Sequence, residues 1–114
     1  MGSAPVELRR PPDMFYAGDS MWIANSGRDV VTRVSKDRQT IRNIQSGTNP
    51  QKLSYDGEYI WAANSMDAMA SKLSLDGEAV ATYPVGAAPT KTLSVNGEIW
   101  VTLTSDDSIA RLKL

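Results

Sequence analysis

Residues 21–26 read Met-Trp-Ile-Ala-Asn-Ser, and nearly the same pattern, Ile-Trp-Ala-Ala-Asn-Ser, returns at residues 60–65. A looser copy, Ile-Trp-Val-Thr-Leu-Thr, occupies residues 99–104. The three tryptophans of the chain therefore stand 39 residues apart both times. A fixed period near 40 residues in strand-like sequence indicates a repeat architecture, in which each unit is one supersecondary element.

The same spacing recurs in columns of other residue types. These columns are Pro11, Pro50 and Pro89; Arg33, Lys72 and Arg111; Val31, Ala70 and Ile109; and Val34, Leu73 and Leu112. So many coincident columns predict an internal threefold repeat with units at approximately residues 5–38, 39–77 and 78–114. Residues 1–4 are interpreted as a remnant of expression or a disordered start.

Each unit is expected to form four short strands, because apolar and β-branched stretches alternate with turn residues. Asp56-Gly57 and Asn96-Gly97 are turn pairs that tolerate positive φ and favour hairpins. No window shows a 3.6-residue apolar period, so almost no helix is expected. The expected strands are residues 6–10, 14–16, 20–25, 30–36, 40–45, 52–55, 58–64, 68–75, 79–85, 91–95, 98–103 and 108–114.

Four antiparallel strands in about 40 residues describe one blade of a β-propeller. The predicted fold class is therefore all-β, with three four-stranded blades that make a half-propeller. Two chains would close a six-bladed propeller, inside the usual range of about 4–8 blades. We expect residues 6–10 of one chain to pair with residues 108–114 of its partner in a homodimer. A fragment of a longer propeller and an engineered half-propeller remain alternatives.

Residues 86–102 read Gly-Ala-Ala-Pro-Thr-Lys-Thr-Leu-Ser-Val-Asn-Gly-Glu-Ile-Trp-Val-Thr, and Ser-Ile-Ala-Arg-Leu follows at residues 108–112. This pattern resembles the YVTN and NHL-type propeller repeats. It is also similar to the streptogramin (virginiamycin B) lyase propellers, and the resemblance covers essentially residues 5–114. It implies a propeller fold. The lyases rely on a His at the channel mouth with a bound magnesium. This chain has no His, which makes lyase activity improbable.

Composition narrows the function classes further. The net charge of −1 and the pI near 5.3 give no electrostatic footprint for nucleic acid. No segment approaches the ~20 apolar residues that cross a bilayer, so no membrane partner is expected. Without His and Cys, neither a Ser/His/Asp nor a Cys/His catalytic set can form. The absence of Cys also leaves the cellular compartment open.

Two columns could bind ligands. The tryptophans could form an aromatic platform in each blade, but their place between apolar neighbours favours packing between blades. The cations Arg33, Lys72 and Arg111 could bind anions around a ring. More often such side chains lie along a blade surface and pair with a carboxylate.

The favoured place for a ligand is the rim where the connections after the tryptophan strands meet the starts of the innermost strands, because loops on a rigid scaffold carry function. Asn25-Ser26 and Asn64-Ser65 begin two of these connections. No cofactor is expected, although rim carboxylates could hold a divalent cation. The candidate rim residues are Asp13, Arg28, Asp29, Gln51, Asp67, Lys91, Asp106 and Asp107.

The sequence thus favours a non-enzymatic binding or scaffold module. Its expected partners are a second copy of itself and a small molecule or glycan at one channel mouth. The alternatives are a lyase- or lactonase-like propeller enzyme with a metal at that mouth, and an engineered or fragment propeller with no native ligand.

Overall fold

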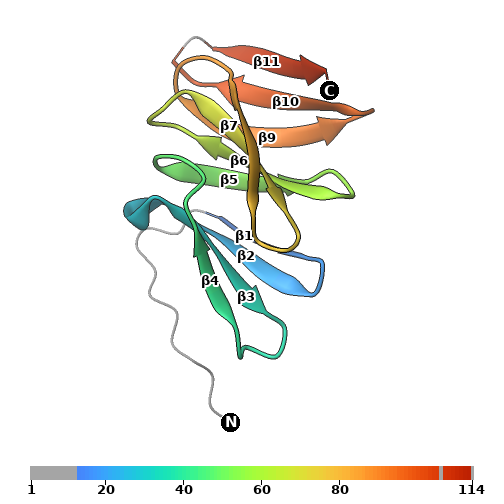
Figure 1. The fold of residues 1–114 in the computed structure, drawn as a ribbon. Helices are drawn as coiled ribbons and strands as arrows, with labels where there is room; N and C mark the ends of the chain where they lie inside the picture. The colour runs from blue at the N-terminus through green and yellow to red at the C-terminus, as the bar shows by residue number, and fades with distance from the viewer. Residues whose placement is uncertain (1–12, 106, 114) are drawn as a thin grey trace.

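In the computed structural model, which describes residues 13–105 and 107–113, eleven β-strands form three antiparallel sheets (Figure 1). The first sheet holds β1 (Asp13–Ala17), β2 (Ser20–Asn25), β3 (Val30–Ser35) and β4 (Ile41–Ile44). The second holds β5 (Pro50–Tyr55), β6 (Tyr59–Asn64), β7 (Met69–Ser74) and β8 (Ala79–Pro84). The third holds β9 (Pro89–Val95), β10 (Glu98–Leu103) and β11 (Ser108–Lys113).

The all-β prediction is confirmed, and each of the eleven strands overlaps a range expected from the sequence. The twelfth expected strand, residues 6–10, lies outside the described residues. The one helical element in the described part is a single 3-10 turn, η1 (Ser26–Arg28), between β2 and β3. No helix in that part is long and apolar enough to cross a membrane.

Each sheet is a meander in which consecutive strands pair, and the three sheets stack face on face from β1–β4 to β9–β11 (Figure 1). The first strands of the sheets contact one another, β1 beside β5 and β5 beside β9. This arrangement is consistent with blades of a partial propeller. Ile41–Ile44 pairs with β3 although the sequence repeat assigns it to the second unit, so the repeat and the sheet differ in phase by one strand.

The first core lies between the first and second sheets. Trp22 is 0% exposed and belongs to this core with Ile60 and Leu73 from the facing sheet. Its indole Nε1 donates to the carbonyl oxygen of Ala17 at 3.0 Å. The indole thus removes a large apolar area from water while its one polar atom is satisfied.

The second core lies between the second and third sheets and is built on Trp61, also 0% exposed, with Ile99 and Val101. Trp100, the third member of the column, is only half-buried. The expectation that all three tryptophans are buried is therefore wrong for Trp100 in the single chain. The described residues place no further sheet on its face.

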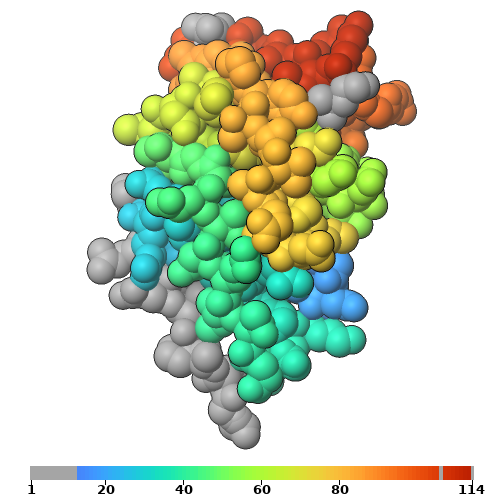
Figure 2. Space-filling model, in the orientation of Figure 1, coloured from blue at the N-terminus to red at the C-terminus, as the bar shows by residue number. Residues whose placement is uncertain are grey.

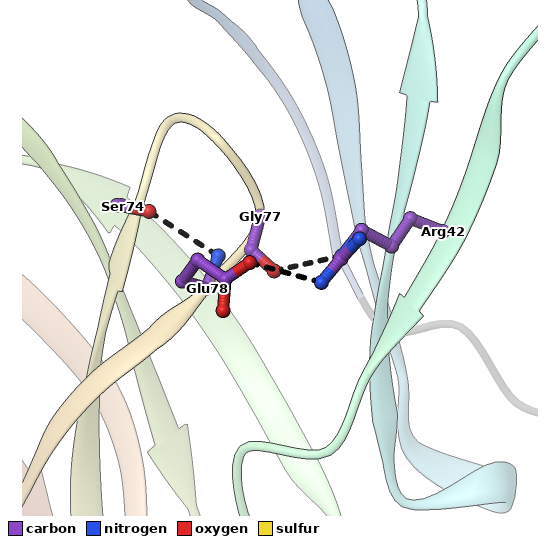
Figure 3. Close-up of polar contacts among 4 residues, drawn as sticks. All are labelled: Arg42, Ser74, Gly77 and Glu78. Atoms are coloured by element: carbon purple, nitrogen blue, oxygen red, sulfur yellow. Dashed lines mark hydrogen bonds and ion pairs between the residues drawn. The ribbon is translucent and has the colours of Figure 1, made fainter.

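An arginine also joins the first and second sheets near their outer edge (Figure 3). Arg42 on β4 donates from Nε to the carbonyl oxygen of Gly77 at 3.0 Å and pairs with Glu78 at 3.0 Å. Ser74 Oγ accepts the backbone N–H of Glu78 and helps to fix this turn. The ion pair is half exposed, so it positions the edge more than it stabilises the fold.

Candidate functional site

The candidate rim is formed by the connections β2–β3, β4–β5 and β6–β7, which lie along one side of the stack, at the left in Figure 1. The sequence places Gly, Asn, Asp and Ser in these connections because they must turn sharply. Asp29, Asn49 and Ala68 all adopt left-handed backbone conformations, with φ of 59°, 58° and 58°. Asp and Asn tolerate that region better than most residues do.

Two rim aspartates hold the β4–β5 connection from both sides. Asp29 Oδ1 accepts the backbone N–H of Asn49 at 2.8 Å, and Asp67 Oδ2 accepts the N–H of Thr48 at 3.0 Å. The Asn49 side chain donates to Ser65 Oγ at 2.6 Å. The structure therefore brings Asp29 and Asp67 to one loop, where both carboxylates brace backbone amides.

Two open hollows flank Thr48. One, of about 300 Å³, is lined by Asp29, Thr48, Asn49 and Met66. The other, of about 400 Å³, is lined by Asp29 and by residues 45–48. Both hollows present carboxylate, amide and hydroxyl groups on a braced loop. Such groups can hydrogen-bond a small polar ligand.

The other predicted rim residues in the described part of the chain occupy several different elements. Asp13 Oδ2 accepts the N–H of Leu53 at 2.8 Å and so ties β1 to β5. Gln51 and Lys91 lie on β5 and β9, and Arg28 ends the 3-10 turn. Asp107 has a left-handed backbone with φ of 51° in the β10–β11 connection, and Asp106 lies outside the described residues.

Two asparagines that the sequence placed beside the rim are core residues instead. Asn25 and Asn64 are both 0% exposed and end β2 and β6. Asn25 Nδ2 donates to Thr32 Oγ1 at 3.4 Å, and Asn64 Nδ2 donates to Ser71 Oγ at 2.7 Å. Both amide nitrogens thus find partners inside the core, while Asn64 Oδ1 is buried without a hydrogen-bond partner in the described part of the chain.

Each residue of the cation column lies close to one tryptophan of the repeat. Arg33, Lys72 and Arg111 lie 5.7, 5.9 and 5.4 Å from the ring centroids of the tryptophans directly opposite them in the sheet. This is cation–π packing between side chains of neighbouring strands. It favours the packing interpretation of the column over a ring of anion sites.

Carboxylates complete two of these arrangements. Glu98 accepts the indole N–H of Trp100 at 3.0 Å and the Nε of Arg111 at 3.1 Å. The hydrogen bond from Arg111, followed by that from Trp100, lowers the pKa of Glu98. Burial alone would raise the pKa of Asp56, but hydrogen bonds from the Trp61 indole and two backbone amides outweigh it and lower that pKa.

Within residues 13–105 and 107–113, no group of three or more His, Cys, Asp or Glu gathers closely enough to hold a metal ion. Sequence reasoning missed Thr48, Asn49 and Met66 as hollow-lining residues. Asn49 had one signal, since Asn before Pro is typical of a turn. Nothing in the sequence marks Thr48 or Met66 as neighbours of Asp29, because that contact depends on how two sheets stack.

Several solved structures are similar to this chain in fold. One is a catalytically inactive virginiamycin B lyase from Staphylococcus aureus with quinupristin, 14% identical with a TM-score of 0.70, matched over 81% of this chain and 33% of that one. A streptogramin B lyase structure is 16% identical with a TM-score of 0.68, matched over 91% of this chain and 40% of that one. Hydrazine synthase from Kuenenia stuttgartiensis is 16% identical with a TM-score of 0.67, matched over 95% of this chain and 36% of that one.

These likenesses show that the fold is related to the propellers of the streptogramin lyases. The matched region makes up only about a third to two-fifths of each of those chains. Identities this low establish the fold and leave the activity open, since propellers carry many functions. No protein-family model matches the chain, and no curated protein matches it.

Proposed function

We propose that this protein is a non-enzymatic binding or scaffold module. In this proposal two copies assemble a six-bladed propeller from half-propellers, and the rim around Thr48 presents a ligand site at one mouth of the channel. A small polar molecule or glycan fits the amide, hydroxyl and carboxylate groups that line the two hollows.

The observation that carries the assembly is the shape of the third sheet. The first and second sheets have four strands, and the third has three, with β11 as its outer edge within the described residues. A fourth strand beside β11 would give it the form of the other two. An open sheet edge is a template for pairing with another chain. Residues 6–10 of a second copy are the strand that we propose for this position.

The observation that favours binding over catalysis is the use of the rim carboxylates. Asp29 and Asp67 each accept a backbone N–H from the β4–β5 connection. These bonds hold the loop in one shape, and a preorganised loop loses little entropy when it binds a ligand. Acid–base work would need a carboxylate placed toward the reacting atoms instead.

The rim can be tested by ligand-observed NMR with a panel of neutral mono- and disaccharides and small polar metabolites. We expect a binder whose signal is lost in Thr48→Trp, which fills both hollows, and is kept in the control Val80→Trp, at an exposed residue on β8. A compound turned over catalytically, with turnover lost in Asp29→Asn or Asp67→Asn, would establish the enzyme alternative. Binding that is unchanged in Thr48→Trp would place the site elsewhere.

A further inference from the structure

Figure 2 shows the two ends of the stack, with the first sheet in blue to green toward the bottom and the third sheet in orange to red at the top. Both ends carry exposed apolar side chains. At the first sheet, Met14 and Tyr16 are 56% and 55% exposed. Tyr16 lines a groove of about 440 Å³ together with Met21, Ile23, Val34, Ser35, Lys36 and Arg38. Met14 lies directly opposite Ile23 in the strand pair β1–β2, and therefore on the same face of the sheet. At the third sheet, Leu93 and Ile109 are 52% and 55% exposed.

The repeat shows what covers such faces inside the molecule. Adding 39 residues to Met14 gives Leu53, and adding 39 to Met21 gives Ile60, which are 6% and 0% exposed in the first core. The face of the second sheet that corresponds to the groove is therefore packed against the tryptophan face of the first sheet. The groove lies on the equivalent face of the first sheet, and no tryptophan face of another sheet packs against it in the described part of the chain.

The opposite end has the matching half. Subtracting 78 residues from Trp100 and Ile109 gives Trp22 and Val31, both 0% exposed in the first core. The third sheet thus has a face equivalent to the tryptophan face of the first sheet. In the first sheet, that face packs onto the second sheet. The three sheets of one chain form two complete joints. Each end sheet also carries one half of the same kind of joint without its partner surface.

We propose that the third-sheet face of one copy docks head to tail into the first-sheet groove of a second copy, with Trp100 against Met21 and Ile23. This inference rests on the proposed homodimer and specifies its joint. We choose a second copy as the partner because the two open faces match each other by repeat equivalence. The groove of one copy is the surface that the tryptophan face of another copy would pack against. A head-to-tail joint of this kind closes into a ring when its rotation permits, and two copies then form two identical joints.

Two substitutions block opposite halves of the joint at positions that are already exposed in the single chain. Met14→Glu charges the groove side, and Ile109→Glu charges the tryptophan side. Each alters both joints of a ring, so each should raise the dimer dissociation constant by roughly a hundredfold or more, because a joint buries a charge without a partner. Val80→Glu, at a residue 49% exposed on β8 of the second sheet, is the matched control and should leave the dissociation constant unchanged.

Sedimentation velocity separates the outcomes, with far-UV circular dichroism to check folding. Wild type and Val80→Glu should sediment as dimers and the two blocking variants as monomers or unfolded chains. A 1:1 mixture of the blocking variants restores one unaltered joint, between the groove of the Ile109→Glu chain and the tryptophan face of the Met14→Glu chain, and places both glutamates in the other joint. The mixture should therefore contain a larger fraction of folded dimer than either variant alone.

Two results overturn this joint while the dimer stands: a dimer that survives either blocking variant, or a mixture of the blocking variants that contains no more dimer than each variant alone. A wild-type monomer at high concentration overturns both the joint and the proposed homodimer. Larger wild-type rings that both variants dissolve support the joint and overturn the six-blade count.

Discussion

Truncating Trp61 to Ala should be among the most damaging single changes in this chain. The side chain is 0% exposed, stacks on Tyr83 at 5.6 Å between ring centroids and donates to Asp56 at 2.8 Å. An indole buries about 200 Å². At about 25 cal/mol per Å² this corresponds to about 5 kcal/mol as an upper estimate. Large-to-small changes of this kind in other cores cost about 3–5 kcal/mol, and we expect that range here.

Urea unfolding followed by far-UV circular dichroism, at one fixed protein concentration, measures this cost. Trp61→Phe is the matched control, because it keeps an aromatic ring in the core and removes the hydrogen bond to Asp56. The Phe variant should lose about 1–3 kcal/mol. If Trp61→Ala folds normally and loses less than about 1 kcal/mol, the indole does not hold the two sheets together and the ligand-platform interpretation returns.

Three further changes test separate parts of the structure. Gly47→Ala should cost about 1–3 kcal/mol in urea unfolding, because the new Cβ would lie 2.4 Å from Asn64 Cγ in a packed site; an unchanged midpoint would show that the β4–β5 connection is looser than described. Arg42→Met should cost only about 1 kcal/mol or less, since its pair with Glu78 is half exposed, and added salt should shrink the difference from wild type. Asp56 has a lowered pKa in the folded chain, so its stabilisation is complete above its unfolded pKa of about 3.9 and is lost as pH falls through the lower folded value. Urea midpoints between pH 5 and pH 2 should fall more steeply for wild type than for Asp56→Asn, and parallel curves would contradict this.

The fold was predictable because it depends on local patterns that repeat. The 39-residue tryptophan column places β2, β6 and β10, and pairs such as Asp56-Gly57 place the hairpin turns between strands. Alternation of apolar residues then sets which face of each strand packs inward. Strand positions follow from such short-range signals without any knowledge of how the sheets stack.

The candidate site was predictable only in part. The sequence indicated that Asp29 and Asp67 belong to connections on one rim. It did not show that both brace the amides of residues 48–49, because that contact joins two sheets. Asn25 and Asn64 were placed at the rim because Asn is common in turns, but burial between sheets gave them polar partners in the core. Trp100 differs from its two counterparts because the described residues place no further sheet against its face.

Completion of the partial propeller by a second copy of the chain is the proposal on which the assembly and its joint both depend. Sedimentation equilibrium of the purified chain over a range of micromolar concentrations is its decisive experiment. We expect a compact species with twice the 12.4 kDa mass of one chain. A folded, stable species of 12.4 kDa at every concentration would refute the proposal.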